Sequence, residues 1–313
     1  MQNLRVIFMG TPDFAVPCLD RLVAENHDVL AVVTQPDRPK GRGQKLAFSP
    51  VKQAALAYGL KVWQPETVKD IAFQNELSDL QPDVIVVVAF GQFLPQNLLN
   101  LPPLGCINVH ASLLPKYRGA APIHWAIING EQITGVTTMY MDAGMDSGDM
   151  ILKTETTIAP NETTGELHDK LKMMGADLLA ETLKMIVEDI APRTPQDHDI
   201  ATYASLLTRK IEGVDWTKPA TAIHNLVRGL NPWPGAYCRS QNRILKIWQT
   251  KIYDTEATIN QPGRIIAFNN NGILVETGIG ILALCEVQPE SKRRLSAQEY
   301  ARGYNLNVGD ILT

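Results

Sequence analysis

A chain of 313 residues with 45% hydrophobic and 20% charged residues has the composition of a globular protein of two domains, which excludes disordered and fibrous classes. No apolar run approaches the roughly 18 residues that span a bilayer, and the N-terminus MQNLRVIFMG lacks the basic, apolar and small-residue succession of a signal peptide. We therefore expect a protein that stays in the cytoplasm.

The net charge of −4 is unevenly distributed along the chain. Residues 1–204 carry a formal charge of −8, and residues 205–313 carry +4. A basic C-terminal third suggests that a polyanion binds there, although many proteins with such a surface bind no nucleic acid. The four cysteines are far apart and match no metal-binding or redox spacing, so we expect buried thiols in a reducing compartment.

The first elements predict a parallel sheet with helices between its strands. Leu4–Met9 and Asp28–Thr34 are apolar runs typical of buried strands, and a helix is expected between them over residues 14–26. This order favours a right-handed crossover and parallel pairing. The turn GTPDFA has one glycine where a dinucleotide fingerprint needs three, and no P-loop motif occurs. Dehydrogenase and nucleoside-triphosphatase functions therefore lose their main support.

Residues 35–50, QPDRPKGRGQKLAFSP, contain three prolines and two glycines, so we expect a long exposed loop without regular structure. Only Asp37 opposes its four basic residues, which are Arg38, Lys40, Arg42 and Lys45. These side chains could contact phosphates, and the prolines would stiffen the loop that presents them. A solvated basic loop is the alternative, and composition alone does not decide between the two.

Two later strands are expected to bring polar groups to one edge of the sheet. Helices are predicted over residues 51–58 and 69–80, and the β-branched run DVIVVVA at 83–89 predicts a central strand buried on both faces. The turn FGQFLP follows it at the carboxyl edge, where open α/β sheets bind ligands. The next strand ends in Asn108 and His110, whose side chains share a face because side chains alternate along a strand.

The loop DAGMDSGDM, between predicted strands at 133–141 and 151–157, carries Asp142, Asp146 and Asp149. Its spacing lacks the frame and terminal Glu of an EF-hand, and a glycine-rich aspartate loop is usually a turn, so we expect no metal. Asn108, His110 and Asp146 supply an amide donor, an imidazole and a carboxylate, which are the groups that acyl-transfer chemistry uses. A lone Asn or His at a strand end would more often be merely solvated.

The remaining chain predicts a second domain of different class. A long helix is expected over residues 162–189, and the proline-rich segment 190–208 is predicted to be the linker. After a helix at 219–230, Gly and Asn turns separate five short strands, at 236–239, 243–250, 263–268, 272–276 and 280–286. These strands predict a small OB-like β-barrel, a fold that often binds nucleic acid.

The predicted fold class is therefore α/β, with a Rossmann-like N-terminal domain and a C-terminal barrel. The mostly parallel sheet flanked by helices would occupy residues 1–189 and form the catalytic domain. The barrel would occupy residues 209–313 and carry the basic surface.

The chain resembles the methionyl-tRNA formyltransferase family, whose members use 10-formyltetrahydrofolate, over nearly its whole length. The matching segments are MGTPDFAVPCL, TQPDRPKGRGQKL, INVHASLLPKYRGAAPIHWAIINGE, GVTTMYMDAGMDSGDM, VDW and LNPWPGA. The central segments are shared by a wider group that includes glycinamide ribonucleotide and sugar-nucleotide formyltransferases. The basic loop and the C-terminal LNPWPGA point to the tRNA enzymes.

The resemblance implies that a formyl group moves from N10 of 10-formyltetrahydrofolate to the α-amino group of methionine on initiator tRNA. The amine would attack directly through a tetrahedral intermediate, with no covalent enzyme intermediate. Asn108 would donate a hydrogen bond to the oxyanion, and His110 would stabilise the oxyanion or move protons. Asp146 would orient and charge-balance the imidazole.

Binding residues also follow from the resemblance. The folate would be walled by Ser112, Leu113, Leu114 and Pro115. Its pterin would be covered by the turn that contains Phe90, Gly91 and Leu94. The tRNA acceptor end would meet Arg38, Lys40, Arg42 and Lys45, with Arg42 the most specific contact, and the barrel would contact phosphates elsewhere.

Nothing in the sequence demands more than a monomer. The runner-up function is formyl transfer to a small amine, such as a ribonucleotide or an amino sugar. A non-catalytic RNA-binding protein built on a decayed formyltransferase core is a further alternative, against which the presence of Asn108, His110 and Asp146 argues.

Overall fold

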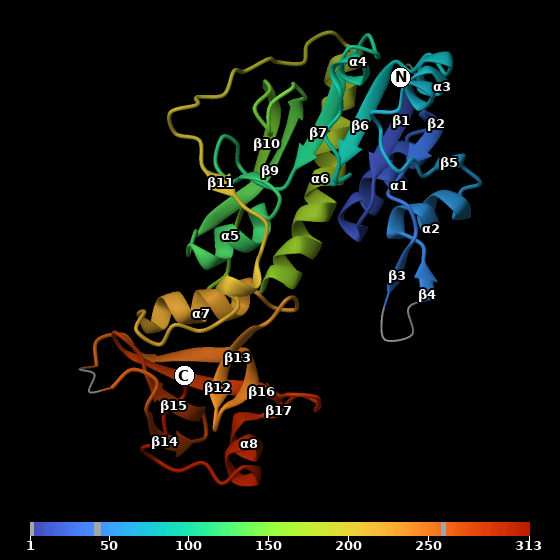
Figure 1. Ribbon diagram of the computed structural model, residues 1–313. Helices are drawn as coiled ribbons and strands as arrows, with labels where there is room; N and C mark the ends of the chain where they lie inside the picture. Colours follow the sequence, from blue (N-terminus) through green and yellow to red (C-terminus); the bar gives the residue numbers. More distant parts are fainter. Residues whose placement is uncertain (1–2, 41–44, 258–260) are drawn as a thin grey trace. The chain divides into compact units, whose positions relative to one another are not determined.

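The computed structural model describes residues 3–40, 45–257 and 261–313 (Figure 1). The chain forms two compact units. Unit 1 comprises Met1–Gly119, Thr134–Thr156 and His168–Ala204, and unit 2 comprises Ala120–Ile133, Thr157–Leu167 and Ser205–Thr313. In the described part of the chain, no helix combines the length and the apolar character that crossing a membrane requires.

Unit 1 is built on a seven-stranded sheet with the strand order β10-β9-β7-β6-β1-β2-β5. The strands are β1 (Arg5–Gly10), β2 (Asp28–Val33), β5 (Val62–Trp63), β6 (Val84–Val88), β7 (Cys106–His110), β9 (Ile133–Tyr140) and β10 (Met150–Thr157). The first five pair in parallel, and β9 is antiparallel to β7. The prediction of a mostly parallel sheet is confirmed.

Helices flank this sheet, as Figure 1 shows. They are α1 (Val16–Ala24), which follows the short 3-10 helix η1 (Asp13–Ala15), α2 (Pro50–Ala57), α3 (Ile71–Asp79), α4 (Gln96–Leu99) and α6 (Thr164–Val187). The hydroxyl of Ser49 accepts from the N–H of Lys52 and caps α2, and the carboxylate of Asp70 accepts from the N–H of Ala72 and caps α3. Every residue of β6 is buried, as the β-branched run predicted, and every residue of β7 is buried as well.

The expectation that residues 35–50 lack regular structure is wrong. Strands β3 (Arg38–Lys40) and β4 (Lys45–Ala47) form an antiparallel pair in which Pro39 lies opposite Leu46. A two-stranded ribbon leaves one edge of each strand unpaired, so it tolerates a proline that would disrupt a central strand. Arg42 lies outside the described residues.

Unit 2 contains a second sheet, with the order β12-β13-β16-β15-β14 and β17 paired to β16. All its strand pairs are antiparallel, which confirms the expected C-terminal β domain. The strands are β12 (Ala236–Ser240), β13 (Arg243–Asp254), β14 (Ile265–Asn269), β15 (Gly272–Glu276), β16 (Ile281–Pro289) and β17 (Leu295–Ser296).

Helices α5 (Pro122–Ile128) and α7 (Ala220–Gly229) pack together in unit 2, and α7 also packs on β13. Helix α8 (Ala297–Gly303) was not predicted. Its start carried a recognisable signal, because Ser296 and Glu299 form a capping box in which each side chain bonds the other residue's backbone N–H.

Candidate active site

The end of β7 carries two buried polar side chains. Asn108 and His110 are 8% and 6% exposed, and their place in the strand puts them on one face of the sheet. Val109 points to the other face, where a Cβ placed on Gly175 of α6 would lie 3.0 Å from its Cγ1. The close fit of α6 on that face leaves Asn108 and His110 on the side of the loops that follow the strand ends.

Asp146 joins these two residues from a loop far along the chain. Its Oδ1 lies 3.4 Å from Nδ2 of Asn108, and its Oδ2 lies 3.7 Å from Nδ1 of His110. The N–H of Gly119 donates to Oδ2 at 2.8 Å and anchors the carboxylate. Asp146 has a φ of 49°, a left-handed backbone that aspartate tolerates better than most residues. The three predicted catalytic residues therefore lie together.

The loop after β7 fixes the imidazole of His110. Its Nε2 lies 2.9 Å from the carbonyl oxygen of Tyr117. A carbonyl only accepts, so Nε2 carries the hydrogen, and Nδ1 is the nitrogen that faces Asp146. Tyr117 has a φ of 60°, so two left-handed non-glycine residues, Tyr117 and Asp146, hold the contacts of one histidine. Such backbone strain is typical of functional sites.

The segment predicted to wall the folate alternates between buried and half-buried residues. Ser112 is fully buried, and its hydroxyl donates to the carbonyl of Lys116 at 2.6 Å. Leu114 packs in a cluster with Met139 and Met150. Leu113 and Pro115 are half-buried, so this segment can offer a ligand two apolar side chains.

The turn after β6 is anchored by its backbone. The hydroxyl of Thr11 and the side-chain amide of Gln35 both donate to the carbonyl of Phe90, at 3.1 and 3.2 Å. The side chains of Phe90 and Leu94 belong to the core of unit 1. Gly91 is exposed and has a φ of 90°, which suits glycine.

A third segment holds both site loops, and sequence reasoning missed it. We call residues 194–204 the strap. Its β11 (Tyr203–Ala204) pairs in parallel with β8 (Arg118–Gly119), and Thr194 forms a backbone bridge with Met150. In the strap, Gln196 contacts the Asp146 loop and the side chain of Arg118. The sequence assigned these residues to a linker, and their mixed, proline-containing pattern carries no local signal of such contacts.

Asp37 pairs with Lys52 and not with the basic residues of the β3–β4 pair. The carboxylate of Asp37 binds the ammonium of Lys52 at 2.5 Å and the amide of Gln64 at 2.8 Å. These hydrogen bonds, that from Lys52 first, lower the pKa of Asp37. Arg38 is exposed. For Lys40 and Lys45 the structure describes the paired backbone.

The aspartate loop folds as a turn, with the carboxylate of Asp142 accepting from the N–H of Gly144 and the hydroxyl of Ser147. A different group among the described residues, Asp13, His168 and Asp169, brings possible metal ligands together. The ammonium of Lys172 lies 2.6 Å from a carboxylate oxygen of Asp169 and supplies positive charge there.

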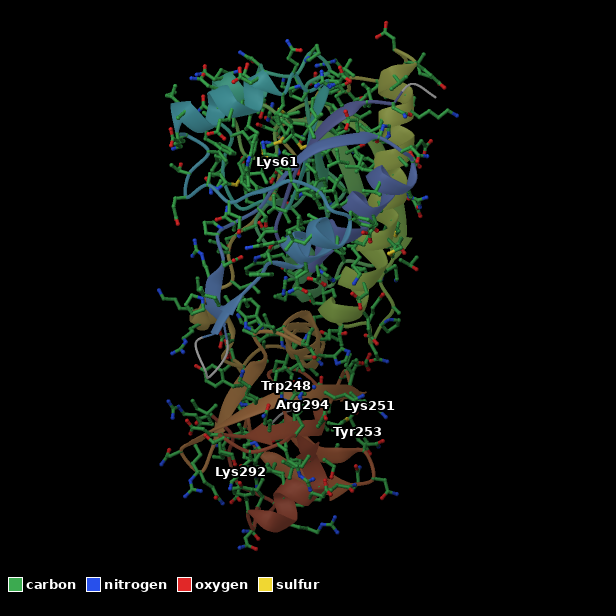
Figure 2. The ribbon with its side chains drawn as sticks, turned by 90° about the vertical axis from the view of Figure 1, so that its right-hand side faces the viewer. Lys61, Trp248, Lys251, Tyr253, Lys292 and Arg294 are labelled. Carbon is green, nitrogen blue, oxygen red and sulfur yellow. The ribbon has the colours of Figure 1, made fainter. Side chains whose placement is uncertain are left out.

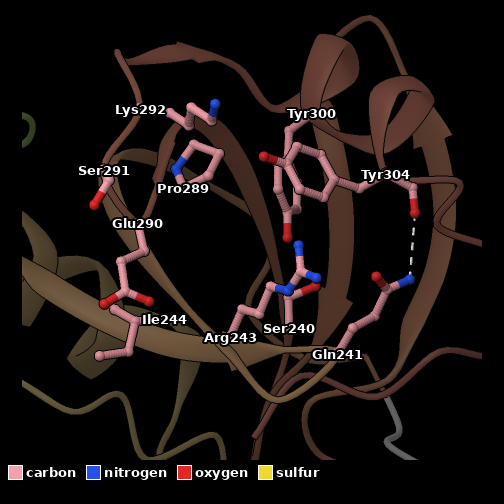
Figure 3. Close-up of a pocket in the computed structure, with 10 residues that line it drawn as sticks. All are labelled: Ser240, Gln241, Arg243, Ile244, Pro289, Glu290, Ser291, Lys292, Tyr300 and Tyr304. Atoms are coloured by element: carbon pink, nitrogen blue, oxygen red, sulfur yellow. Dashed lines mark hydrogen bonds between the residues drawn. The ribbon is translucent and has the colours of Figure 1, made fainter.

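Unit 2 brings aromatic and basic side chains together on β13 and in the segment between β16 and β17. The guanidinium of Arg294 lies 3.7 Å from the ring centroid of Trp248, and Figure 2 shows these two side chains together, with Lys251 and Tyr253 on the same unit. A cavity of about 320 Å³ is lined by residues that include Arg243, Lys292 and Tyr300. In Figure 3 the hydroxyl of Tyr300 points toward Arg243, and burial raises the pKa of this tyrosine.

Two family patterns match the chain. One, described as formyl transferase, matches residues 3–183, and the other, described as the C-terminal domain of formyl transferase, matches residues 207–305.

Relatives match along almost the whole chain. A methionyl-tRNA formyltransferase from Clostridioides difficile (strain 630) is 52% identical over 309 residues, which covers 99% of this chain and 100% of the relative. Another from Acetivibrio thermocellus is 50% identical over 309 residues, which covers 99% of each chain.

Solved structures of lower identity share the fold. HypX from Aquifex aeolicus in complex with tetrahydrofolic acid has a TM-score of 0.66 and 16% identity, with 99% of this chain and 49% of that chain covered. An N-formyltransferase from Helicobacter canadensis in complex with folinic acid and dTDP-3-aminofucose has a TM-score of 0.68 and 20% identity, with 90% and 99% covered.

Proposed function

The chain belongs to the formyl transferase family and formylates methionyl-tRNA for the initiation of translation, and from this premise we propose its formyl donor, its acceptor atom and the part that each site residue takes. The donor is a folate derivative, 10-formyltetrahydrofolate. The acceptor is the α-amino group of methionine esterified to initiator tRNA. A protein of this fold in complex with tetrahydrofolic acid supports a folate donor.

The reaction exchanges one C–N bond for another. The uncharged amine attacks the formyl carbon, which gives a tetrahedral species with a negatively charged oxygen. The bond from carbon to N10 then breaks, the amine nitrogen gives up one proton, and N10 takes one up. The protein therefore has to stabilise an oxyanion and move a proton, and it needs no covalent intermediate.

Asn108 is suited to stabilise the oxyanion by donating a hydrogen bond to it. Its Nδ2 is a donor at the buried end of β7, and a neutral donor held in a site sheltered from water stabilises developing negative charge strongly. Its contact to Asp146 is long, at 3.4 Å, so the amide can turn toward a bound formyl oxygen at little cost.

His110 and Asp146 are suited to accept and transfer the proton of the amine. Because Nε2 of His110 is committed to the Tyr117 carbonyl, Nδ1 exchanges the proton, and Asp146 stands 3.7 Å away to balance the imidazolium. This distance is longer than a hydrogen bond, and catalytic hydrogen bonds often tighten only when substrate is bound.

The folate is held by backbone and apolar groups from the two loops that flank the site. Leu113 and Pro115 offer half-buried apolar surface, and Ser112 and Leu114 keep that segment in place from within. Phe90 and Leu94 fix the neighbouring turn from the core, so this turn presents backbone N–H and C=O groups at Gly91 to the polar edge of a pterin.

The tRNA is bound by phosphate contacts from two regions. Arg38, Lys40, Arg42 and Lys45 form the first, at the acceptor end, and the +4 charge of residues 205–313 forms the second. We place the activity in the cytoplasm. We also propose that the protein is a monomer, which sedimentation of the purified protein would test.

One observation carries this proposal: Asn108, His110 and Asp146 lie together at one strand end. The chain that holds them is about half identical to full-length relatives. The test is transfer of labelled formyl from 10-formyltetrahydrofolate to Met-tRNA, free methionine and small amines in parallel. Label on Met-tRNA alone supports it, and comparable label on an amino sugar or free methionine would favour a small-amine formyltransferase.

A further inference from the structure

Gln196 lies between the two loops that build the site and uses every hydrogen-bonding group of its amide. Its Nε2 donates to the carbonyls of Asp146 and Gly148, both at 2.8 Å. Its Oε1 accepts from Nε and Nη2 of Arg118, at 3.0 and 2.7 Å. Gln196 and Arg118 are 5% and 2% exposed, so these bonds form away from water, where losing a partner is costly.

The chemistry of its partners fixes the orientation of this amide. Arginine only donates and backbone carbonyls only accept, so Oε1 faces Arg118 and the NH₂ group faces the Asp146 loop. Glutamate at this position would keep the contact to Arg118 but would have no hydrogen to donate to either carbonyl. Glutamine is therefore required by the contacts to Asp146 and Gly148, and not by those to Arg118.

Two contacts hold Asp146 in place, and the strap supports both of them. Gln196 holds its backbone, which has a left-handed φ of 49° that needs support from its surroundings. Gly119 holds its carboxylate, and Gly119 itself belongs to β8, which pairs with β11 of the strap. A Cβ at Gly119 would lie 2.9 Å from the carbonyl oxygen of Ala204, so the strap approaches as closely as a glycine permits.

We propose that Gln196, oriented by the fork of Arg118, is a positioning residue for formyl transfer that aligns the carboxylate of Asp146 with His110 and Asn108. Gln196 touches neither reactant in this role. Because it acts only through Asp146, its role rests on the proposed function.

The discriminating variant is Gln196→Glu, which keeps the volume and the Arg118 contact and removes both donors to the loop. We expect kcat for formylation of Met-tRNA to fall by about 10- to 100-fold, because small misplacements of a catalytic group have effects of this size. The KM values for Met-tRNA and 10-formyltetrahydrofolate should stay within about twofold. A wild-type kcat, or a change confined to KM, would overturn the role.

A second variant and a matched control separate positioning from loss of stability. Gln196→Met keeps the length of the side chain without charge and should lower kcat in the same way. The control is Thr182→Val, which removes a buried hydroxyl bonded to Thr138 and to the carbonyl of Leu178, away from the site loops. It should lower the melting temperature with kcat unchanged, and an equal kcat loss in Thr182→Val and the Gln196 variants would also overturn the role.

The same assay distinguishes this inference from the proposed function. If Asp146→Asn abolishes transfer while Gln196→Glu does not, the positioning role fails and the proposed function stands. If Asp146→Asn remains fully active, the role proposed for Asp146 is wrong, and the role of Gln196, which depends on it, is wrong with it.

Discussion

Nδ1 of His110 and Oδ2 of Asp146 lie 3.7 Å apart, held by different anchors. The imidazole is fixed through Nε2 by the carbonyl of Tyr117, and the carboxylate is fixed by the N–H of Gly119. Since both anchors come from one loop, the separation of the pair is set by local backbone. A small shift on substrate binding would let the two groups share a proton.

Replacing His110 with alanine should lower kcat by about 10²- to 10⁴-fold, the contribution typical of a positioned acid or base. Binding of tRNA and folate should persist, because the side chain is buried beside the reacting groups and contributes little to either surface. Single-turnover formyl transfer and equilibrium binding measured on the same preparation check this. Turnover within about threefold of wild type would contradict the catalytic role.

Replacing Asp146 with asparagine should lower kcat by about 100-fold or more, because the amide keeps the shape of the carboxylate but not the charge opposite Nδ1 of His110. Asp142→Asn is the matched control in the same loop. Its carboxylate accepts from Gly144 and Ser147 in a turn, and an amide oxygen can do the same. Similar losses in both variants would mean that the loop, and not the charge, is being disturbed.

Affinity for tRNA should fall steeply with salt, because each neutralised phosphate releases counterions. Arg38→Ala and Arg42→Ala should each weaken binding and reduce the slope of log K against log salt concentration by about 1. Lys69→Ala, which removes an exposed cation outside residues 38–45, should leave the slope unchanged. Binding titrations over a range of salt concentrations give these slopes, and a flat response in the wild type would rule out extensive phosphate contact.

His224 should make unit 2 less stable in acid. Burial lowers the pKa of this histidine from its ordinary value of 6.5, and its Nε2 donates to the carbonyl of Pro160 while Nδ1 accepts from the hydroxyl of Thr250. The folded state therefore favours the neutral ring. Its contribution to stability is present above pH 6.5 and is lost as the pH falls below that value toward the lowered pKa.

Melting temperatures of wild type and His224→Gln measured from about pH 7.5 to 5.0 test this linkage. The variant should be less stable at neutral pH and lose less stability on acidification. Parallel curves for the two proteins would show that another group carries the pH dependence.

Thiol reagents should modify Cys285 before the other cysteines. Cys18, Cys106 and Cys238 are buried, and burial raises the pKa of each thiol to about 12, so little thiolate forms at neutral pH. Cys285 is half-buried, and its pKa is raised as well, so labelling should be slow and should accelerate with pH. Mass spectrometry after alkylation locates the label, and Cys285→Ser should remove it. Early labelling of Cys18 would contradict the buried core.

The parts of the site that lie within one strand were open to prediction. The β-branched run of β6 and the alternation in β7 place Asn108 and His110 on one face at the sheet edge, because side-chain direction in a strand depends only on position. Asp146 was a candidate because of its carboxylate, but its role beside His110 came from resemblance to a family, since no periodicity relates it to β7. Its meeting with His110 is a result of tertiary structure.

The sequence by itself determined the fold class, the residues with reactive groups and the basic segments, because these depend on local pattern and composition. Only the tertiary structure decided how those groups are held. Arg118 and Gln196 are 78 residues apart, and a contact of that span leaves no trace in local periodicity. The pairing of β3 with β4 was hidden for a related reason: Pro39 indicated a loop, and pairing with a second strand outweighed that local preference.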